Sequence, residues 1–325
     1  MEKSPLISGL APRALEEIQR CRGSRFFWLD VLVDGVELDA SSARDRLKTD
    51  LGVPEHALNV LFDFSSETPM LRKYHADGEH VVFAFYWITH PDAALQLGPL
   101  AIERVEVHVL VHGDYLLTVH DRPARLQPPP EESPPAERGE KYLVFFALFE
   151  MTISLFEALT FVGEELQKLE AGEVEGAVTD LRTIRSLRAR LTELRRIAGR
   201  QTVLFSHVAE EIEQVKGLEG SARYFARIDD QLGRLLDGID ATGHALASVI
   251  DQGMNRIMFR LTVVATIFLP LTVITGFFGM NFDWLIGQIA SLSDFLVFGA
   301  GSIVAAIVIA AIVMRRELPV LVRRD

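Results

Sequence analysis

Two long apolar stretches near the C-terminus constrain this chain more than any other feature of its sequence. Residues 261–282 contain no charged side chain, and residues 295–314 form a second apolar run. About 20 consecutive apolar residues are needed to cross the hydrocarbon core of a bilayer as a helix, and each stretch meets that length. The sequence therefore predicts two transmembrane helices, with most of the chain on one side of the membrane.

The positions of the positive charges predict the orientation of these helices. Arg256 and Arg260 precede the first stretch, and Arg315 and Arg316 follow the second, whereas residues 261–314 contain no Lys or Arg. Because Lys and Arg beside a span are retained on the cytoplasmic side, both termini are expected in the cytoplasm. We expect a multi-pass protein of the cell (inner) membrane, without a cleaved signal peptide. The single cysteine, Cys21, suits a reducing compartment.

Composition and motifs argue against several classes of function. The formal net charge of -12 disfavours a nucleic-acid partner, because phosphate binding needs a basic surface. The sequence contains no phosphate-binding loop and no nucleophile elbow, so we expect neither an enzyme nor a cofactor. Three histidines lie close in sequence, but a hairpin at Gly113-Asp114 places His120 on the opposite face from His108. With His112 they do not form a metal site.

The first part of the chain has the pattern of an α/β domain. Residues 26–33 and 80–89 are predicted strands, and residues 105–112 and 115–120 flank the hairpin signal. Residues 43–51 are predicted as a short helix, capped by Ser41 and Ser42 and closed by Gly52 and Pro54.

The remainder is helical in pattern. Five prolines within residues 127–137 mark a boundary, and helices are predicted over 141–169 and 178–208. A third helix begins near Glu219 and meets no proline before Pro270, which gives a rod of roughly 90 Å to Phe278. The predicted order is a cytoplasmic α/β domain (1–126), a Pro-rich linker (127–137), cytoplasmic helices (138–218), a stalk helix continuing into the first transmembrane helix (219–282), an external loop (283–294), a second transmembrane helix (295–314) and a basic cytoplasmic tail (315–325).

One face of the long helix is polar or small. In heptad steps it presents Asp237, His244, Asp251 and Met258, and a companion line includes Asn255, Thr262, Leu269 and Gly276. A coiled-coil seam would be apolar. We interpret this stripe as the lining of a pore in a homo-oligomer, because two spans per chain cannot enclose a pathway. Two alternatives stay open: close packing of small residues between membrane helices, and a membrane-anchored sensing oligomer that conducts no ion.

The tripeptide Gly279-Met280-Asn281 ends the first stretch. Glycine often terminates helices, so Gly279 alone indicates only a possible cap. A second copy of the tripeptide, Gly253-Met254-Asn255, lies inside the helical pattern. Only Gly279-Met280-Asn281 falls where the first span meets the outer surface.

At these residues the chain resembles the CorA-type divalent-metal transporters. The similarity runs over residues 255–272, continues through Gly276 to residues 279–282, and extends more weakly over the whole chain. The resemblance implies a homopentamer in the lipid bilayer with a funnel-shaped cytoplasmic domain. It implies a selectivity motif of Gly279, Met280 and Asn281, with the outer ring at Asn281. The pore-lining residues that it implies are Asn255, Met258, Leu261, Leu269 and Thr272, to which the polar stripe adds His244, Asp251 and Thr262.

The ion expected first is Mg²⁺, with Co²⁺ and Ni²⁺ also permeating. A ring of asparagine amides can recognise hydrated Mg²⁺ by hydrogen bonds and still release it. Asn281, Asp251 and His244 are the candidate metal-contacting residues, and Asp283 is the acidic residue at the outer mouth. The imidazole of His244 favours Zn²⁺, so a zinc transporter, with or without proton coupling, is the alternative. The resemblance also implies that cytoplasmic Mg²⁺ bound between protomers closes the channel. Asp229, Asp230, Asp237 and Asp240 are candidates for that site, although a solvated surface is the better explanation for each.

Overall fold

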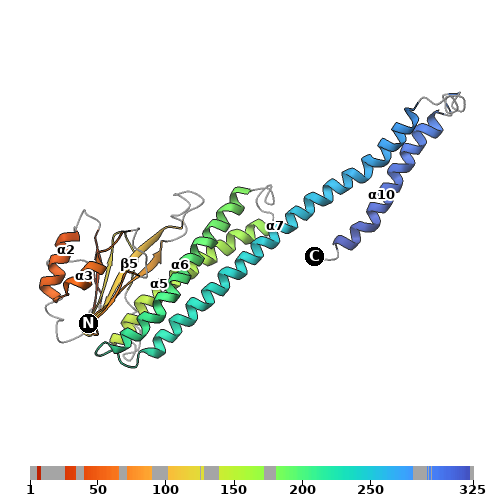
Figure 1. Ribbon diagram of the computed structural model, residues 1–325. Coiled ribbons are helices and arrows are strands. Elements are labelled where there is room, and N and C mark those ends of the chain that lie inside the picture. The colour runs from red at the N-terminus through yellow and green to blue at the C-terminus, as the bar shows by residue number, and fades with distance from the viewer. Residues whose placement is uncertain are drawn as a thin grey trace. The chain divides into compact units, whose positions relative to one another are not determined.

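The computed structural model describes residues 6–8, 26–33, 40–65, 72–89, 102–124, 126–127, 139–171, 181–280, 291, 293 and 295–322. The chain divides into two compact units, Met1–Ala247 and Ser248–Asp325 (Figure 1). The predicted linker falls almost entirely outside the described residues, as does the predicted external loop.

The first unit contains a six-stranded mixed sheet with the order β1-β2-β6-β5-β4-β3. Strands β1 (Leu6–Ser8), β2 (Phe27–Leu32) and β6 (Tyr115–His120) are parallel, and β5 (Arg104–Val111), β4 (Val81–Ile88) and β3 (Tyr74–Ala76) continue the sheet antiparallel. The predicted hairpin is present, and Val107 pairs with His120 as expected. Strands β1 and β3 were not predicted, because three residues are too few to show an alternating pattern.

One face of the sheet is covered by α2 (Ala40–Arg46), the π-helical turn η1 (Leu47–Leu51) and α3 (Glu55–Leu61). Gly52 ends η1 in the left-handed conformation, with φ 72°, and its N–H donates to the carbonyl of Leu47. The prediction for Ser41 and Ser42 was wrong, because both lie within α2 rather than at its cap. The core beneath these helices contains Phe27, Leu29, Val31, Leu47, Leu58, Leu61, Val82, Leu110, Leu117 and Val119.

The other face is covered by α5 (Glu140–Ala171) and α6 (Leu181–Gln214), as Figure 1 shows. The backbone N–H of Ile88 donates to Ser154 Oγ of α5 at 3.1 Å. Gln201 Nε2 of α6 donates to the carbonyl of Tyr86 at 3.4 Å. Both predicted helices are confirmed, and α6 runs six residues beyond its expected end at Val208.

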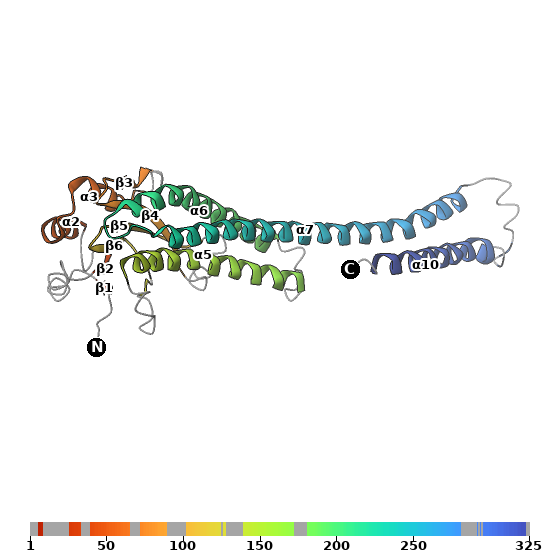
Figure 2. The same cartoon turned by 90° about the horizontal axis from the view of Figure 1, so that it is seen from below.

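Helix α7 (Ala222–Phe278) is a single helix of 57 residues, with Pro270 inside it. Its first part lies alongside α5 and α6 (Figure 2). The rings of Phe225 and Phe205 meet edge to face at 5.9 Å, and Tyr224 lies 5.4 Å from Phe145 of α5. The predicted helix start near Glu219 is therefore correct to within three residues.

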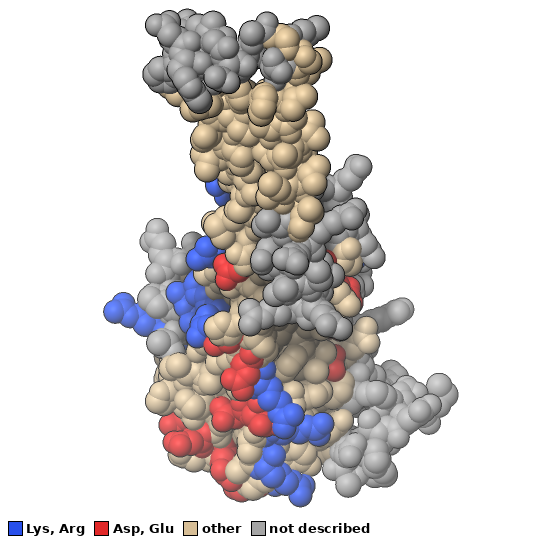
Figure 3. All heavy atoms as spheres, turned by 90° about the vertical axis from the view of Figure 1, so that its right-hand side faces the viewer, with Lys and Arg blue, Asp and Glu red and all other residues tan. Residues whose placement is uncertain are grey.

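The described residues of the second unit include the rest of α7, the π-helical turn η5 (Phe295–Ala300) and α10 (Gly301–Val322). Helix α10 continues past the predicted end of the second span at Met314 and includes Arg315 and Arg316. On the face that Figure 3 shows, the apolar part of this unit carries no Lys, Arg, Asp or Glu. Among the described residues, α5 and α7 are the two helices long and apolar enough to cross a membrane, and 296–310 is a shorter apolar helix.

Candidate functional site

The first part of the predicted stripe on α7 is the face that the first unit leaves uncovered. Asp237 and His244 are exposed, whereas Leu235 and Leu246 are buried against the other helices. In this part of α7, packing separates the polar face from the apolar face as the sequence pattern predicts.

Beyond Gly253 no residue of α7 is fully buried within one chain, but one face is half-buried and consists of Val263, Thr266, Ile267, Pro270, Leu271, Ile274 and Phe278. The expected lining residues Met258 and Leu261 are 54% and 64% exposed, but Ile257, expected on another face, is also 44% exposed. Burial therefore separates a half-buried face of the apolar part of α7 from a wider exposed side, which includes the expected lining residues. The predicted lining residues His244, Asp251, Asn255, Met258, Leu261, Thr262, Leu269 and Thr272 are all exposed.

A single chain does not bring His244 and Asp251 together. His244 and Asp251 are two helical turns apart, which corresponds to roughly 10 Å along the axis. From His244 to Thr272 the rise is roughly 42 Å. One copy of α7 therefore supplies only single ligands at successive levels, and a coordination site requires further copies.

The threonine hydroxyls of the stripe donate to their own helix. Thr262 Oγ1 donates to the carbonyl of Met258 at 2.9 Å, and Thr272 Oγ1 donates to the carbonyl of Phe268 at 2.8 Å. A hydroxyl whose proton is already used keeps its oxygen lone pairs as acceptors. Such an oxygen can accept a hydrogen bond from the water shell of a cation.

Pro270 adds a backbone acceptor to the same segment. Proline has no N–H, so the carbonyl of Thr266, four residues earlier, lacks its usual helical donor. Unpaired backbone groups at membrane depth are tolerated where they meet protein or a water-filled cavity.

The end of α7 does not use the left-handed cap that its glycine would permit. Gly279 is not among the glycines with positive φ, and its N–H donates to the carbonyl of Thr275 at 2.9 Å. A Cβ at this position would lie 3.1 Å from that carbonyl oxygen, so space restricts residue 279. Met280 is exposed, whereas Asn281 and Asp283 lie outside the described residues.

Two of the four candidate regulatory carboxylates have a cationic partner within the chain. Asp240 forms an ion pair with Arg195 of α6, and Asp230 accepts from Arg234 Nε at 2.9 Å. Asp229 and Asp237 are exposed. Because a paired carboxylate must give up its partner to bind a metal, the regulatory hypothesis is weaker for Asp230 and Asp240.

The three histidines of the hairpin are held separately. His108 Nδ1 lies 2.7 Å from the carbonyl of Leu61, whereas His120 Nε2 lies 3.1 Å from Asp30 Oδ1 on the opposite face. His112 Nδ1 accepts from the N–H of Asp114 at 3.1 Å. The structure thus places His108 and His120 on opposite faces of the sheet, as the predicted hairpin register requires.

Sequence reasoning missed the buried charge network beside His108. Lys73, which is 2% exposed, pairs with Glu106, and His108 Nε2 lies 2.8 Å from the same carboxylate. Burial alone would raise the pKa of Glu106, but the hydrogen bonds from His108 and Lys73 outweigh it and lower the pKa. The network joins Lys73, the residue before β3, to two residues of β5. None of the three is a predicted site residue, which indicates a structural role.

Comparison with known proteins places this arrangement in a family. A family model described as CorA-like Mg²⁺ transporter protein matches residues 24–316. A putative metal ion transporter, YfjQ of Bacillus subtilis (strain 168), is 28% identical over 164 residues, which cover 46% of this chain and 49% of the relative. The zinc transport protein ZntB of Photorhabdus laumondii is 33% identical over 110 residues, covering 31% of this chain and 33% of the relative. The matched segments thus span half or less of these curated relatives.

The fold is also similar to a solved structure. The complete CorA magnesium transporter from Methanocaldococcus jannaschii superposes with a TM-score of 0.56 at 20% identity, covering 90% of each chain. At this identity the likeness concerns the fold alone. Since the family model covers most of the sequence, from the α/β domain through α7 to α10, the chain belongs to the family of CorA-like Mg²⁺ transporter proteins.

Proposed function

We propose that this chain is one protomer of a homo-oligomeric channel that moves divalent metal cations across the cell membrane. The observation that carries this proposal is the exposed polar stripe, which continues along one unbroken helix into an apolar segment with no buried residue in its most apolar window. An apolar surface of this size requires lipid or further protein as its cover. Several copies around an axis, five by family resemblance, would place the stripe against water.

The chemistry of the stripe suits a hydrated cation. Its threonine hydroxyls are neutral acceptors, which bind the water shell of Mg²⁺ weakly enough to release it. We place the selectivity ring at Gly279, Met280 and Asn281. Exposed Leu261 and Leu269 supply an apolar constriction that gates by dewetting. Both termini are then cytoplasmic, and Asp283 lies at the outer mouth.

Mg²⁺ is the ion that we propose first. Zn²⁺ is the second candidate, and the specific observation in its favour is the exposed imidazole of His244 on the stripe. A relative named as a zinc transport protein supports the same alternative.

Flux into liposomes that contain only this protein tests the proposal. Mg²⁺ and Zn²⁺ entry would be measured with ion-sensitive dyes, with and without a proton gradient. Asn281→Ala should abolish or strongly reduce flux while the mass of the oligomer is unchanged. Normal flux through an assembled Asn281→Ala variant would contradict the assignment of Asn281 to the selectivity ring. A protein that purifies in detergent as a monomer or dimer would contradict the pore model.

The same assay separates the two ions. If Zn²⁺ is the substrate, His244→Ala should reduce Zn²⁺ flux and leave Mg²⁺ flux nearly unchanged. If Mg²⁺ is the substrate, His244→Ala should be nearly silent, and Asp251→Asn should lower conductance by removing negative charge from the pathway. His207→Ala, which alters an exposed histidine of α6, is the matched control. Equal loss of both ions on His244→Ala would assign that residue to packing.

A further inference from the structure

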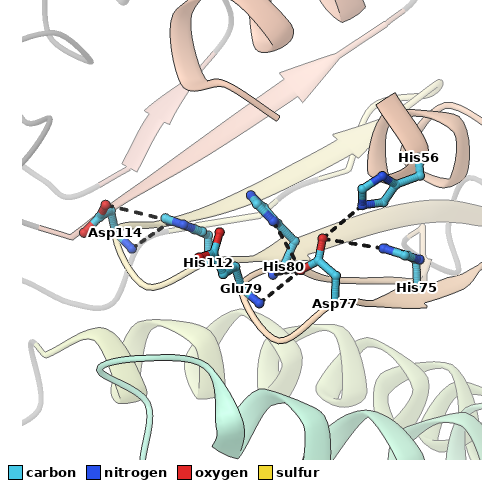
Figure 4. Close-up of polar contacts among 7 residues, drawn as sticks. All are labelled: His56, His75, Asp77, Glu79, His80, His112 and Asp114. Atoms are coloured by element: carbon cyan, nitrogen blue, oxygen red, sulfur yellow. Dashed lines mark hydrogen bonds and ion pairs between the residues drawn. The ribbon is translucent and has the colours of Figure 1, made fainter. Parts of the chain in front are cut away.

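A second group of polar side chains lies in the α/β part of the first unit, around Asp77 (Figure 4). His56 comes from α3, His75 from the edge strand β3, and Asp77 from the turn between β3 and β4. His80, at the far side of this turn, also points toward Asp77 in Figure 4. Three separate elements therefore direct nitrogen and oxygen ligands to one place.

The turn fixes the orientation of the Asp77 carboxylate. Its Oδ1 accepts from the backbone N–H of Glu79 at 3.0 Å and of His80 at 2.7 Å. Gly78 between them has φ 88°, a conformation that favours glycine. With Oδ1 held by the backbone, Oδ2 faces the two imidazoles.

The ligand atoms have the spacing of a metal site. Asp77 Oδ2 lies 3.0 Å from His56 Nε2 and 3.6 Å from His75 Nε2, and the three atoms all lie within 4.8 Å of one another. Bonds of about 2.0–2.1 Å to a tetrahedral Zn²⁺ place neighbouring ligand atoms roughly 3.3 Å apart. Small side-chain movements are enough to reach that geometry.

Two buried ring nitrogens provide an independent observation. His75 Nε2 and His80 Nδ1 are inaccessible to solvent and have no hydrogen-bond partner in the described structure. His80 is 8% exposed, and its Nδ1 lies 3.4 Å from Asp77 Oδ1. A buried polar atom without a partner is uncommon and often marks a missing ion or water. A cation between the three ligand atoms would satisfy His75 Nε2.

We propose that His56, His75 and Asp77 bind one borderline divalent cation per chain, with Zn²⁺ as the best match. Two neutral imidazoles and one carboxylate are ligands typical of Zn²⁺, Co²⁺ and Ni²⁺, whereas Mg²⁺ prefers oxygen ligands. Three protein ligands leave a fourth position for water. The ion would tie α3 to the β3–β4 turn and so stabilise the edge of the sheet. This site is separate from α7 and does not depend on the proposed transport function.

Metal binding to the full-length protein in detergent, stripped with a chelator, tests the site. Calorimetric titration with Zn²⁺ should show a site with a stoichiometry of one per chain, and Mg²⁺ should not compete for it. Co²⁺ in its place should develop visible absorption typical of tetrahedral nitrogen and oxygen ligation. His56→Ala should weaken this site about tenfold or more, while the matched control His207→Ala should not. Zn²⁺ should also raise the melting temperature of the wild type more than that of His56→Ala.

A second variant guards against a simple loss of folding. Asp77→Asn keeps the Oδ1 acceptor that the turn needs but removes the charged ligand, so it should fold and still lose the site. Equal melting temperatures in chelator would establish that both variants fold. Unchanged Zn²⁺ stoichiometry and affinity in both would overturn the proposal, as would loss of the only Zn²⁺ site in His244→Ala. In those cases the contact between His56 and Asp77 only packs α3 against the turn.

Discussion

Helix α5 and the apolar part of α7 are similar in length and composition, but they differ in how much of their surface is buried within the chain. More than half of the most apolar window of α5 is buried within the first unit, whereas none of that of α7 is buried. Leu155 of α5 is fully buried, while Leu269 of α7 is 71% exposed. Apolar length alone therefore does not identify a membrane span, because a core helix needs the same residues.

Charge distinguishes the two helices within the sequence itself. Helix α5 carries Glu150 and Glu157 within its apolar run, whereas α7 has no charged residue from Leu261 to its end. Burial, followed by the charge of Glu157, raises the pKa of Glu150. A helix packed in a soluble unit can place such groups at its edge, but a lipid-exposed helix cannot.

The largest expected effect comes from placing a charge in the buried helix. Leu155→Asp should destabilise the first unit by about 4 kcal/mol or more, because it buries an unpaired carboxylate. That is a large share of a typical unfolding free energy of about 5–15 kcal/mol. Thermal unfolding and limited proteolysis measure the change. Thr160→Asp, at an exposed position of the same helix, is the control and should remain near wild type.

A smaller effect is expected where the sheet meets the base of α7. A Cβ on Gly113 would lie 2.6 Å from the carbonyl oxygen of Lys216, in the turn before α7. Gly113→Ala should therefore cost about 1–3 kcal/mol by overpacking. A Cβ on Gly199 of α6 would meet no atom within 4 Å, so Gly199→Ala should raise the free energy of unfolding by about 0.5–1 kcal/mol. Equal melting temperatures for the two variants would show that α7 is not tightly seated at this hairpin.

The two regions should also differ in how histidines affect stability. Burial alone would lower the pKa of His120, but the hydrogen bond and charge of Asp30 raise it above 6.5. Its contribution to stability is therefore fully present below pH 6.5 and is lost as pH rises through the folded-state pKa. Asp30→Asn should remove this pH-dependent loss of stability. Melting curves recorded from below pH 6.5 to above the folded-state pKa of His120 would reveal the difference.

Two comparisons isolate this effect. Burial lowers the pKa of His112, so its contribution has the opposite sign, and only the difference between wild type and Asp30→Asn reports His120. His244→Ala should leave the melting profile unchanged, because that imidazole is exposed. A pH profile identical in wild type and Asp30→Asn would contradict the assignment.

The smallest effect is expected at the ion pair between α6 and α7. Arg195 and Asp240 have side-chain exposures of 62% and 40%, so solvent screens their attraction. Arg195→Ala should change the free energy of unfolding by no more than about 1 kcal/mol. Chemical denaturation at low and high salt measures it, and a larger, salt-independent loss would mean that Arg195 packs α7 through its aliphatic stem.

Much of the fold could be predicted because its signals are local. The strands β2, β4, β5 and β6 follow apolar runs between turn residues, and α5, α6 and α7 follow helical periodicity. Strand β3 and helix α3 left no such signal, so the group around Asp77 could not be predicted. The one available sign was His75-Ala-Asp77, in which two metal-ligand types stand two residues apart.

The sequence by itself determined that α7 is one helix, since no residue before Pro270 breaks its pattern, and that its outer part is uncharged. It also determined the order of the stripe, because helical periodicity fixes which residues share a face. Only the tertiary structure decided that α5 is a core helix, that Asp240 is paired with Arg195, and that His56 meets Asp77. These outcomes depend on contacts between segments far apart in sequence, and the local pattern of a chain does not specify such contacts.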